Sequence, residues 1–155
     1  MIKINVITNN NKWLSYIKKP NYYLDKKISK LNSKEKKFKK KQIFCTLLLS
    51  GSKEIRYLNK KFRKKNKATD VLSFPFQTKK ELKKKLKTEK EIYLGDIIIN
   101  LNKIKSKNEK FFFETEFDRL WIHGLVHLFG HDHKKDKDFK IMRQVEKNYL
   151  DLVND

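Results

Sequence analysis

All four histidines of this 155-residue chain lie in one run of eleven residues, H-G-L-V-H-L-F-G-H-D-H at positions 123–133. Residues 116–129 form an apolar segment of helical length, which places His123 and His127 one turn apart on the same face of a helix. His133 follows after the turn and can supply a third imidazole. Three neutral imidazoles with an open fourth position are the ligands of a catalytic zinc site, whereas four protein ligands close a structural one.

The spacing H-x-x-x-H-x-x-G-x-x-H is that of the metzincin proteases, in which a glutamate directly follows the first histidine and acts as the general base. Here that position is Gly124. Gly130 is expected to end the helix, since glycine readily takes the left-handed conformation. The sequence therefore predicts a metal site without the peptidase's base; the alternative is a chance cluster of core or surface histidines.

Two further polar residues lie between the predicted ligands. His131 is out of phase with them, which favours an outer-shell or exposed role over ligation. Asp132 is a candidate outer-shell partner of a ligand, or simply a turn residue.

The composition predicts a single domain over residues 1–155. Cys45 is the only cysteine and lies in an apolar run, so a buried thiol in a reducing, cytoplasmic protein is expected. No signal peptide or membrane-spanning segment is predicted. The formal net charge of +21 favours a polyanionic partner, although a Lys-, Asn- and Ile-rich chain is also what an AT-rich genome encodes.

Hydrophobic patterning predicts an α/β or α+β fold, in which a single sheet of about four strands is covered by helices and the metal helix packs on one face. The expected strands are Ile2–Thr8, Ile43–Leu49, Thr69–Phe76 and Tyr93–Leu101. The expected helices are Lys53–Arg63, 116–129 and Lys137–Val153, with helical pieces between residues 12 and 31 broken at Pro20.

Local details of this pattern are also testable. Ser52 is expected to be the N-cap of the helix 53–63, which would turn Ile55, Leu58 and Phe62 inward. The charged stretch 77–91 is either a short helix or a mobile insert.

A zinc site of this kind favours hydrolysis. Phosphodiesters are preferred over peptides as substrates, because the peptidase's glutamate is missing and the chain is strongly basic. Phosphodiester cleavage needs a cation for the charge of the transition state, and Arg63, beside a basic loop, is the candidate. A solvated arginine without a special role is the alternative.

The run at 123–133 resembles the signature of the YbeY family of bacterial rRNA-maturation endoribonucleases. The block T-D-V-L-S-F-P at 69–75 is similar to the family's second block. Leu58-Asn59 through Arg63 and the block L-G-D-I at 94–97 follow the family's order and spacing, and the resemblance extends from about Ile43 to the C-terminus.

This resemblance implies a small α/β fold and a zinc-dependent, single-strand-specific endoribonuclease that acts in 16S rRNA 3′-end maturation and ribosome quality control. It implies His123, His127 and His133 as ligands of one Zn²⁺ per chain, and Arg63 as the arginine of the cleft. The expected partners are single-stranded RNA, the 16S rRNA precursor and the small ribosomal subunit. A zinc-activated water would attack the phosphodiester while Arg63 holds the phosphate. The rival interpretations are a ribosome-assembly factor with structural zinc and, less favoured, a metallopeptidase.

Overall fold

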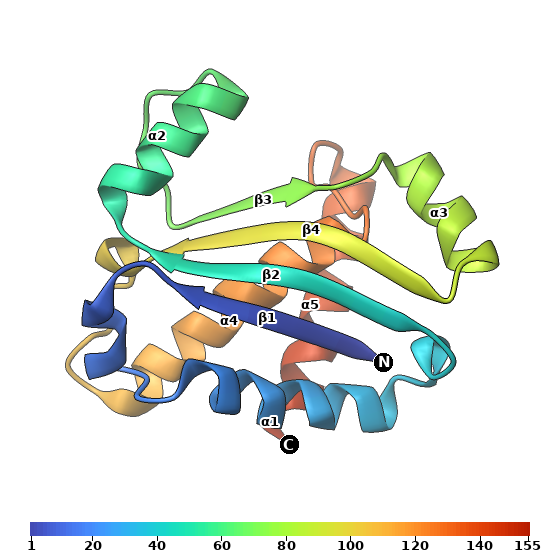
Figure 1. Cartoon of the computed structure of the whole chain (residues 1–155), viewed down its shortest axis with the longest axis horizontal. Coiled ribbons are helices and arrows are strands. Elements are labelled where there is room, and N and C mark those ends of the chain that lie inside the picture. The colour runs from blue at the N-terminus through green and yellow to red at the C-terminus, as the bar shows by residue number, and fades with distance from the viewer.

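The computed structural model describes residues 1–155 and is built around one mixed four-stranded sheet (Figure 1). The strands are β1 (Ile2–Thr8), β2 (Gln42–Ser50), β3 (Val71–Pro75) and β4 (Glu91–Asn100). The α-helices are α1 (Pro20–Lys34), α2 (Ser52–Arg63), α3 (Lys79–Thr88), α4 (Lys110–Leu128) and α5 (Asp136–Asn154). Short 3₁₀ helices are η1 (Asn11–Ser15), η2 (Lys36–Phe38) and η3 (Leu101–Lys103). The predicted fold class and all four predicted strands are confirmed.

The strands lie in the order β1-β2-β4-β3, with β1, β2 and β4 parallel and β3 antiparallel to β4 at one edge. Figure 1 shows α4 and α5 behind the sheet and α1 along its β1 edge. The helix with the histidines, α4, packs against β3 and β4, as predicted.

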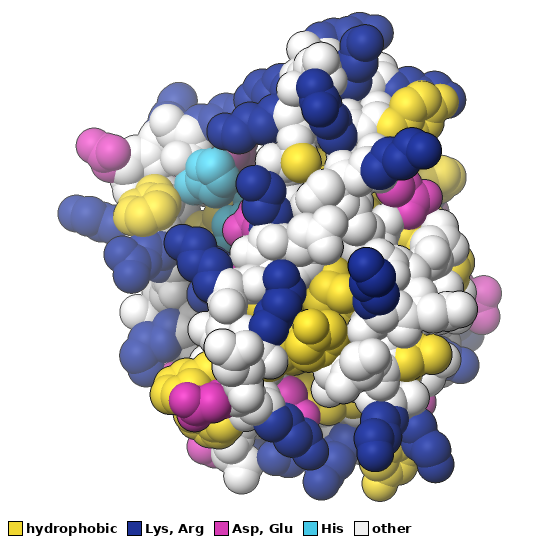
Figure 2. All heavy atoms as spheres, turned by 90° about the vertical axis from the view of Figure 1, so that its left-hand side faces the viewer, with side chains coloured by type: hydrophobic (Ala, Val, Ile, Leu, Met, Phe, Trp, Pro, Cys, Tyr) yellow, Lys and Arg dark blue, Asp and Glu magenta, His cyan; other side chains and the backbone are white.

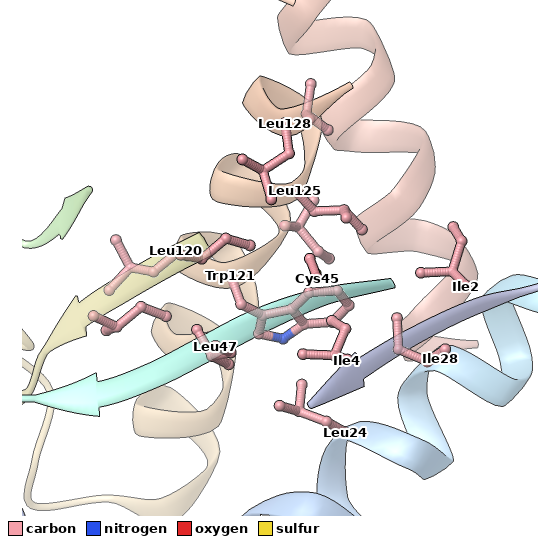
Figure 3. Packing of buried hydrophobic residues seen from close by; sticks show 14 of the residues in the cluster. Ile2, Ile4, Leu24, Ile28, Cys45, Leu47, Leu120, Trp121, Leu125 and Leu128 are labelled. Atoms are coloured by element: carbon pink, nitrogen blue, oxygen red, sulfur yellow. The ribbon is translucent and has the colours of Figure 1, made fainter. Parts of the chain in front are cut away.

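The core lies between the sheet and these three helices. Strand β2 turns Ile43, Cys45, Leu47 and Leu49 into it, and all four are completely buried. Figure 3 shows Trp121 of α4 over this layer, with residues of β1 and α1 on its other side. Cys45 is thus a buried free thiol, as the sequence predicts.

Helix α1 begins at Pro20, whose fixed φ suits a first helical position and whose missing N–H costs the helix nothing there. A buried carboxylate then joins α1 to α4. Asp118 accepts hydrogen bonds from the Tyr23 hydroxyl at 2.9 Å and from the indole N–H of Trp121 at 2.8 Å, and its other oxygen lies 2.8 Å from the ammonium group of Lys27.

Helix α2 lies on the other face of the sheet and covers only part of it, so two predictions about this helix are wrong. Ser52 is its first residue, not its N-cap, which is Gly51. The Ser52 hydroxyl instead accepts from the side-chain amide of Asn100 at 3.0 Å. Phe62 is 59% exposed, because it lies outside the buried cluster around Ile55 and packs edge-on against Phe74 of the edge strand β3.

The charged stretch 77–91 contains helix α3, which a capping box fixes at its start. The hydroxyl of Thr78 accepts from the backbone N–H of Glu81, and the Glu81 carboxylate accepts from the backbone N–H of Thr78. Leu82 anchors the helix in the core. No helix of the structure has both the length and the apolar character needed to span a membrane.

Candidate metal centre

The site begins with the close approach of α4 to the sheet. Gly124 is buried, and a β-carbon at this position would lie 2.6 Å from Cγ2 of Ile97 in β4. The position at which a metzincin carries its glutamate therefore faces the sheet and has no room for a side chain. Its neighbour His123 and, one turn on, His127 lie on the other, half-exposed side of the helix.

The helix ends through Gly130, whose φ of +87° is in the left-handed region, as the sequence predicts. The turn that follows brings the chain back toward α4. Asp132 holds this turn, since its carboxylate accepts from the backbone N–H of His133 at 2.7 Å. Of the two roles open to Asp132, the structure shows the turn residue.

His123, His127 and His133 meet in one cluster. Their ring centroids are 4.6 Å apart for His123 and His127, 5.1 Å for His127 and His133, and 6.0 Å for His123 and His133. One ring nitrogen of each lies within 4.8 Å of those of the other two. A tetrahedral zinc ion holds its nitrogen ligands about 3.3 Å apart at Zn–N distances of about 2.0–2.1 Å, so modest closure of the rings fits them to the ion.

Two of the rings are already oriented by acceptors. Nδ1 of His123 lies 2.6 Å from a carboxylate oxygen of Glu146 in α5, and Nδ1 of His127 lies 3.0 Å from the backbone carbonyl oxygen of His131. Both acceptors place the ring proton on Nδ1 and leave Nε2 with a free lone pair. A hydrogen bond of this kind is how metal-binding histidines are usually fixed.

The electrostatics favour a neutral imidazole at His127. Burial and the neighbouring His123 lower the pKa of His127, which keeps its ring deprotonated and able to bind a metal. Burial of the Glu146 carboxyl opposes ionisation, but the hydrogen bond that it accepts from His123 outweighs this effect, and the pKa of Glu146 is lowered.

Glu146 is the residue that the sequence analysis missed. It lies 23 positions beyond His123 on a different helix, and its partner is set only by the packing of α5 on α4. A carboxylate in the middle of an amphipathic helix was the available signal, but many exposed acidic residues share that pattern.

His131 stands outside the cluster, as its phase suggests. It is half-buried, and burial together with Lys79 and Lys37 lowers the pKa of its imidazole. Its contribution to the site is its backbone carbonyl oxygen, which orients His127.

Arg63 is not among the clustered side chains, but hydrogen bonds connect it to the same helix. Its guanidinium donates to the backbone carbonyl of Ser73 in β3 at 3.1 Å and lies 5.8 Å from the centre of the Phe74 ring. The buried hydroxyl of Ser73 donates in turn to the carbonyl of Gly124, next to His123, at 3.3 Å. The side chain is otherwise exposed, with donors free for a ligand.

The surface around the site is basic. Figure 2 shows histidine side chains at the surface with lysine and arginine side chains around them. Basic side chains are also spread over the rest of that face. A polyanion therefore meets favourable charge on its way to the histidines.

Comparisons with known proteins agree on one family. Residues 7–154 match the family described as Endoribonuclease YbeY. The chain is 45% identical over 148 residues to the Endoribonuclease YbeY of Pelagibacter ubique, covering 94% of this chain and 92% of that protein, and 33% identical over 155 residues to that of Ehrlichia canis, covering 99% and 93%. It also matches the solution structure of TM1509 from Thermotoga maritima, with 27% identity and a TM-score of 0.51 over 99% of this chain and 89% of that one.

Proposed function

The chain belongs to the YbeY family of endoribonucleases, and from this premise we propose that it is a metal-dependent endoribonuclease whose zinc ligands are His123, His127 and His133. The observation that carries the proposal is the approach of the three imidazoles to within 4.8 Å at their ligand atoms. The substrate we propose is single-stranded RNA, and the place of action is the 3′ end of 16S rRNA in the cytoplasm, in ribosome maturation and quality control.

A zinc ion in this cluster would lower the pKa of a water in its open position to about 7 and polarise a phosphoryl oxygen. The residues of the chain do the rest. Glu146 keeps His123 in the tautomer that presents Nε2, and the His131 carbonyl does the same for His127. Arg63 binds the phosphate, and its donors stabilise the negative charge that builds up in the transition state.

Peptide hydrolysis is disfavoured by the same geometry. The two carboxylates that bond to residues of the cluster are engaged, Glu146 with the ring of His123 and Asp132 with the backbone of His133. A glutamate at position 124 would point into Ile97 and away from the histidines.

The decisive experiment measures zinc by elemental analysis and cleavage of single-stranded RNA on the same samples of wild type, His127→Ala and His131→Ala. We expect about one zinc per chain in wild type and His131→Ala. We expect both zinc and cleavage to be lost in His127→Ala. His131→Ala is the matched control, because it removes a neighbouring imidazole but keeps the carbonyl that orients His127. A metal-free wild type that still cleaves RNA would overturn the proposal.

Arg63→Ala separates the nuclease from an assembly factor with structural zinc. Loss of a transition-state donor lowers kcat by about 100-fold or more while zinc content stays unchanged. Arg56→Ala is the matched control, because Arg56 lies on the same helix and bonds only to the exposed side chain of Asn66. Full activity in Arg63→Ala, or stoichiometric zinc without any cleavage in wild type, would favour the assembly factor.

The RNA class is tested with a segment of the 16S rRNA precursor that spans the mature 3′ end. We expect cleavage of the free strand and protection when a complementary strand is annealed. Equal cleavage of both forms would refute single-strand specificity.

A further inference from the structure

A groove of about 940 Å³ lies at the other end of α4, between its first turns and the start of α1. Its lining contains seven lysines, three tyrosines and a single glutamate. The groove is separate from the histidines: Phe113 lines it, whereas His123 comes ten residues later on the same helix, roughly 15 Å along the axis at 1.5 Å per residue.

The charge of this groove exceeds what the composition alone predicts. The fourteen lining residues include seven lysines and one glutamate, so their positive charge per residue is far higher than that of the whole chain, which carries +21 over 155 residues. Lys27 is paired with buried Asp118, and Lys110 lies 3.8 Å from Glu114. The remaining five lysines form none of the chain's ion pairs, so their charge is available to a ligand.

The tyrosines of the groove divide into two that hold the fold and one that is free. Tyr16 stacks on Phe113 with ring centroids 4.7 Å apart, and the hydroxyl of Tyr23 bonds to Asp118. Tyr22 is 69% exposed and takes part in neither kind of contact. An exposed tyrosine among lysines offers a flat surface on which a base can stack while the lysines bind the flanking phosphates.

We propose that this groove is a second binding site for single-stranded RNA. It binds a part of the substrate strand that lies remote from the bond to be cleaved at the histidines. Lys18 and Lys26 contact its phosphates, and Tyr22 stacks on a base. A concave, lysine-lined groove with an exposed aromatic ring fits a single strand better than a flat anionic membrane surface. The inference rests on the proposed RNA cleavage and adds to it a contact that favours long substrates over short ones.

The test is the affinity of a fluorescein-labelled single-stranded RNA, measured by anisotropy at several salt concentrations. Lys18→Glu/Lys26→Glu is compared with Lys39→Glu/Lys40→Glu, a double variant with the same charge change in the exposed turn beyond the far end of α1. We expect the groove variant to bind at least about tenfold more weakly, with a salt slope shallower by about 1.4, or about 0.7 per lost phosphate contact. The control variant should lie close to wild type.

Tyr22 gives an independent readout that charge does not affect. Tyr22→Ala should weaken binding by about 5- to 150-fold, the range for loss of one stacked base, whereas Tyr22→Phe should retain the affinity because it keeps the ring. Thermal unfolding of each variant confirms that the fold is intact.

Cleavage assays then separate this inference from the proposed function. The groove variants should have a lower kcat/KM for a long RNA. Their kcat/KM for a short RNA that contains only the nucleotides around the cleaved bond should be unchanged. If wild type binds RNA through the groove but cleaves none, the proposed function fails and the groove stands. Equal weakening in the groove and control variants would overturn the groove, since bulk charge would explain binding. The groove proposal would also be overturned if the groove variants bound RNA as well as wild type but lost binding to phosphatidylglycerol vesicles.

Discussion

At the scale of single residues, the histidine site depends on Glu146, whose carboxylate orients His123 through a 2.6 Å hydrogen bond. Glu146→Gln keeps the size of the side chain but replaces the charged acceptor of the His123 Nδ1–H with a neutral amide oxygen, which weakens the support for the His123 tautomer. We expect zinc affinity to fall by about 10- to 100-fold, as for other outer-shell partners of metal ligands. Competition with a chelating dye measures the change.

Asp151→Asn provides the control for Glu146→Gln. Asp151 lies on the same helix and pairs only with exposed Lys147. Its replacement should leave zinc affinity unchanged, whereas an equal loss in both variants would show a general effect of charge.

Gly124 is the second residue on which the site depends, because it lets α4 approach Ile97. Gly124→Ala gains up to about 1 kcal/mol of helix propensity but forces a methyl group to within 2.6 Å of Cγ2 of Ile97, a clash that we expect to cost about 2–3 kcal/mol, the upper part of the range for overpacking. We expect a net loss of about 1–2 kcal/mol in the free energy of unfolding, measured by urea denaturation. A variant as stable as wild type would show that the helix shifts without cost.

The histidine cluster could be predicted from sequence because its members lie within eleven residues, and a helix followed by a glycine turn is a local arrangement. Glu146 could not, since its role arises from the packing of two helices. The exposure of Phe62 was missed for the same reason: the periodicity of α2 gives an apolar face, but the partly covered sheet determines how much of that face is buried.

At the scale of elements, Asp118 is the connection between α1 and α4. Asp118→Ala leaves the Lys27 ammonium, the Tyr23 hydroxyl and the Trp121 indole N–H without their partner at a buried position. Each buried donor left without its acceptor costs about 1–3 kcal/mol, and the loss of the pair with Lys27, which is partly exposed and keeps its bond to Asn154, adds less, so we expect a total loss of about 3–5 kcal/mol in chemical denaturation. Asp151→Asn should cause no comparable change, and a loss in Asp118→Ala no larger than in that exposed control would contradict the assignment.

The element pattern was predicted where hydrophobic periodicity is strong, as in all four strands and in α5. It was ambiguous for α3, although Thr78 and Glu81 form the T-x-x-E sequence of a capping box, which was the available signal. The prediction for Ser52 was wrong because its hydroxyl can either cap α2 or bond to another side chain. In the structure it bonds to Asn100, and Gly51 is the N-cap.

At the scale of the whole molecule, Cys45 reports on the opening of the core. The thiol is completely buried, and burial raises its pKa to about 12, so the reactive thiolate is nearly absent at neutral pH in the folded state. Alkylation of this only cysteine should therefore require unfolding of the sheet and of the helices that cover it.

Zinc should slow that alkylation, because an ion bound by α4 and by the turn before α5 stabilises only the folded chain. At a free zinc concentration of 100 times Kd, the stabilisation is about 2.7 kcal/mol, and labelling at neutral pH should become about 100-fold slower when unfolding and refolding are fast relative to alkylation. In His127→Ala the same zinc concentration should give no protection. Equal protection in that variant would show that the ion acts elsewhere. If wild type binds zinc but is not protected, Cys45 is reached by a local opening that leaves the histidine site intact.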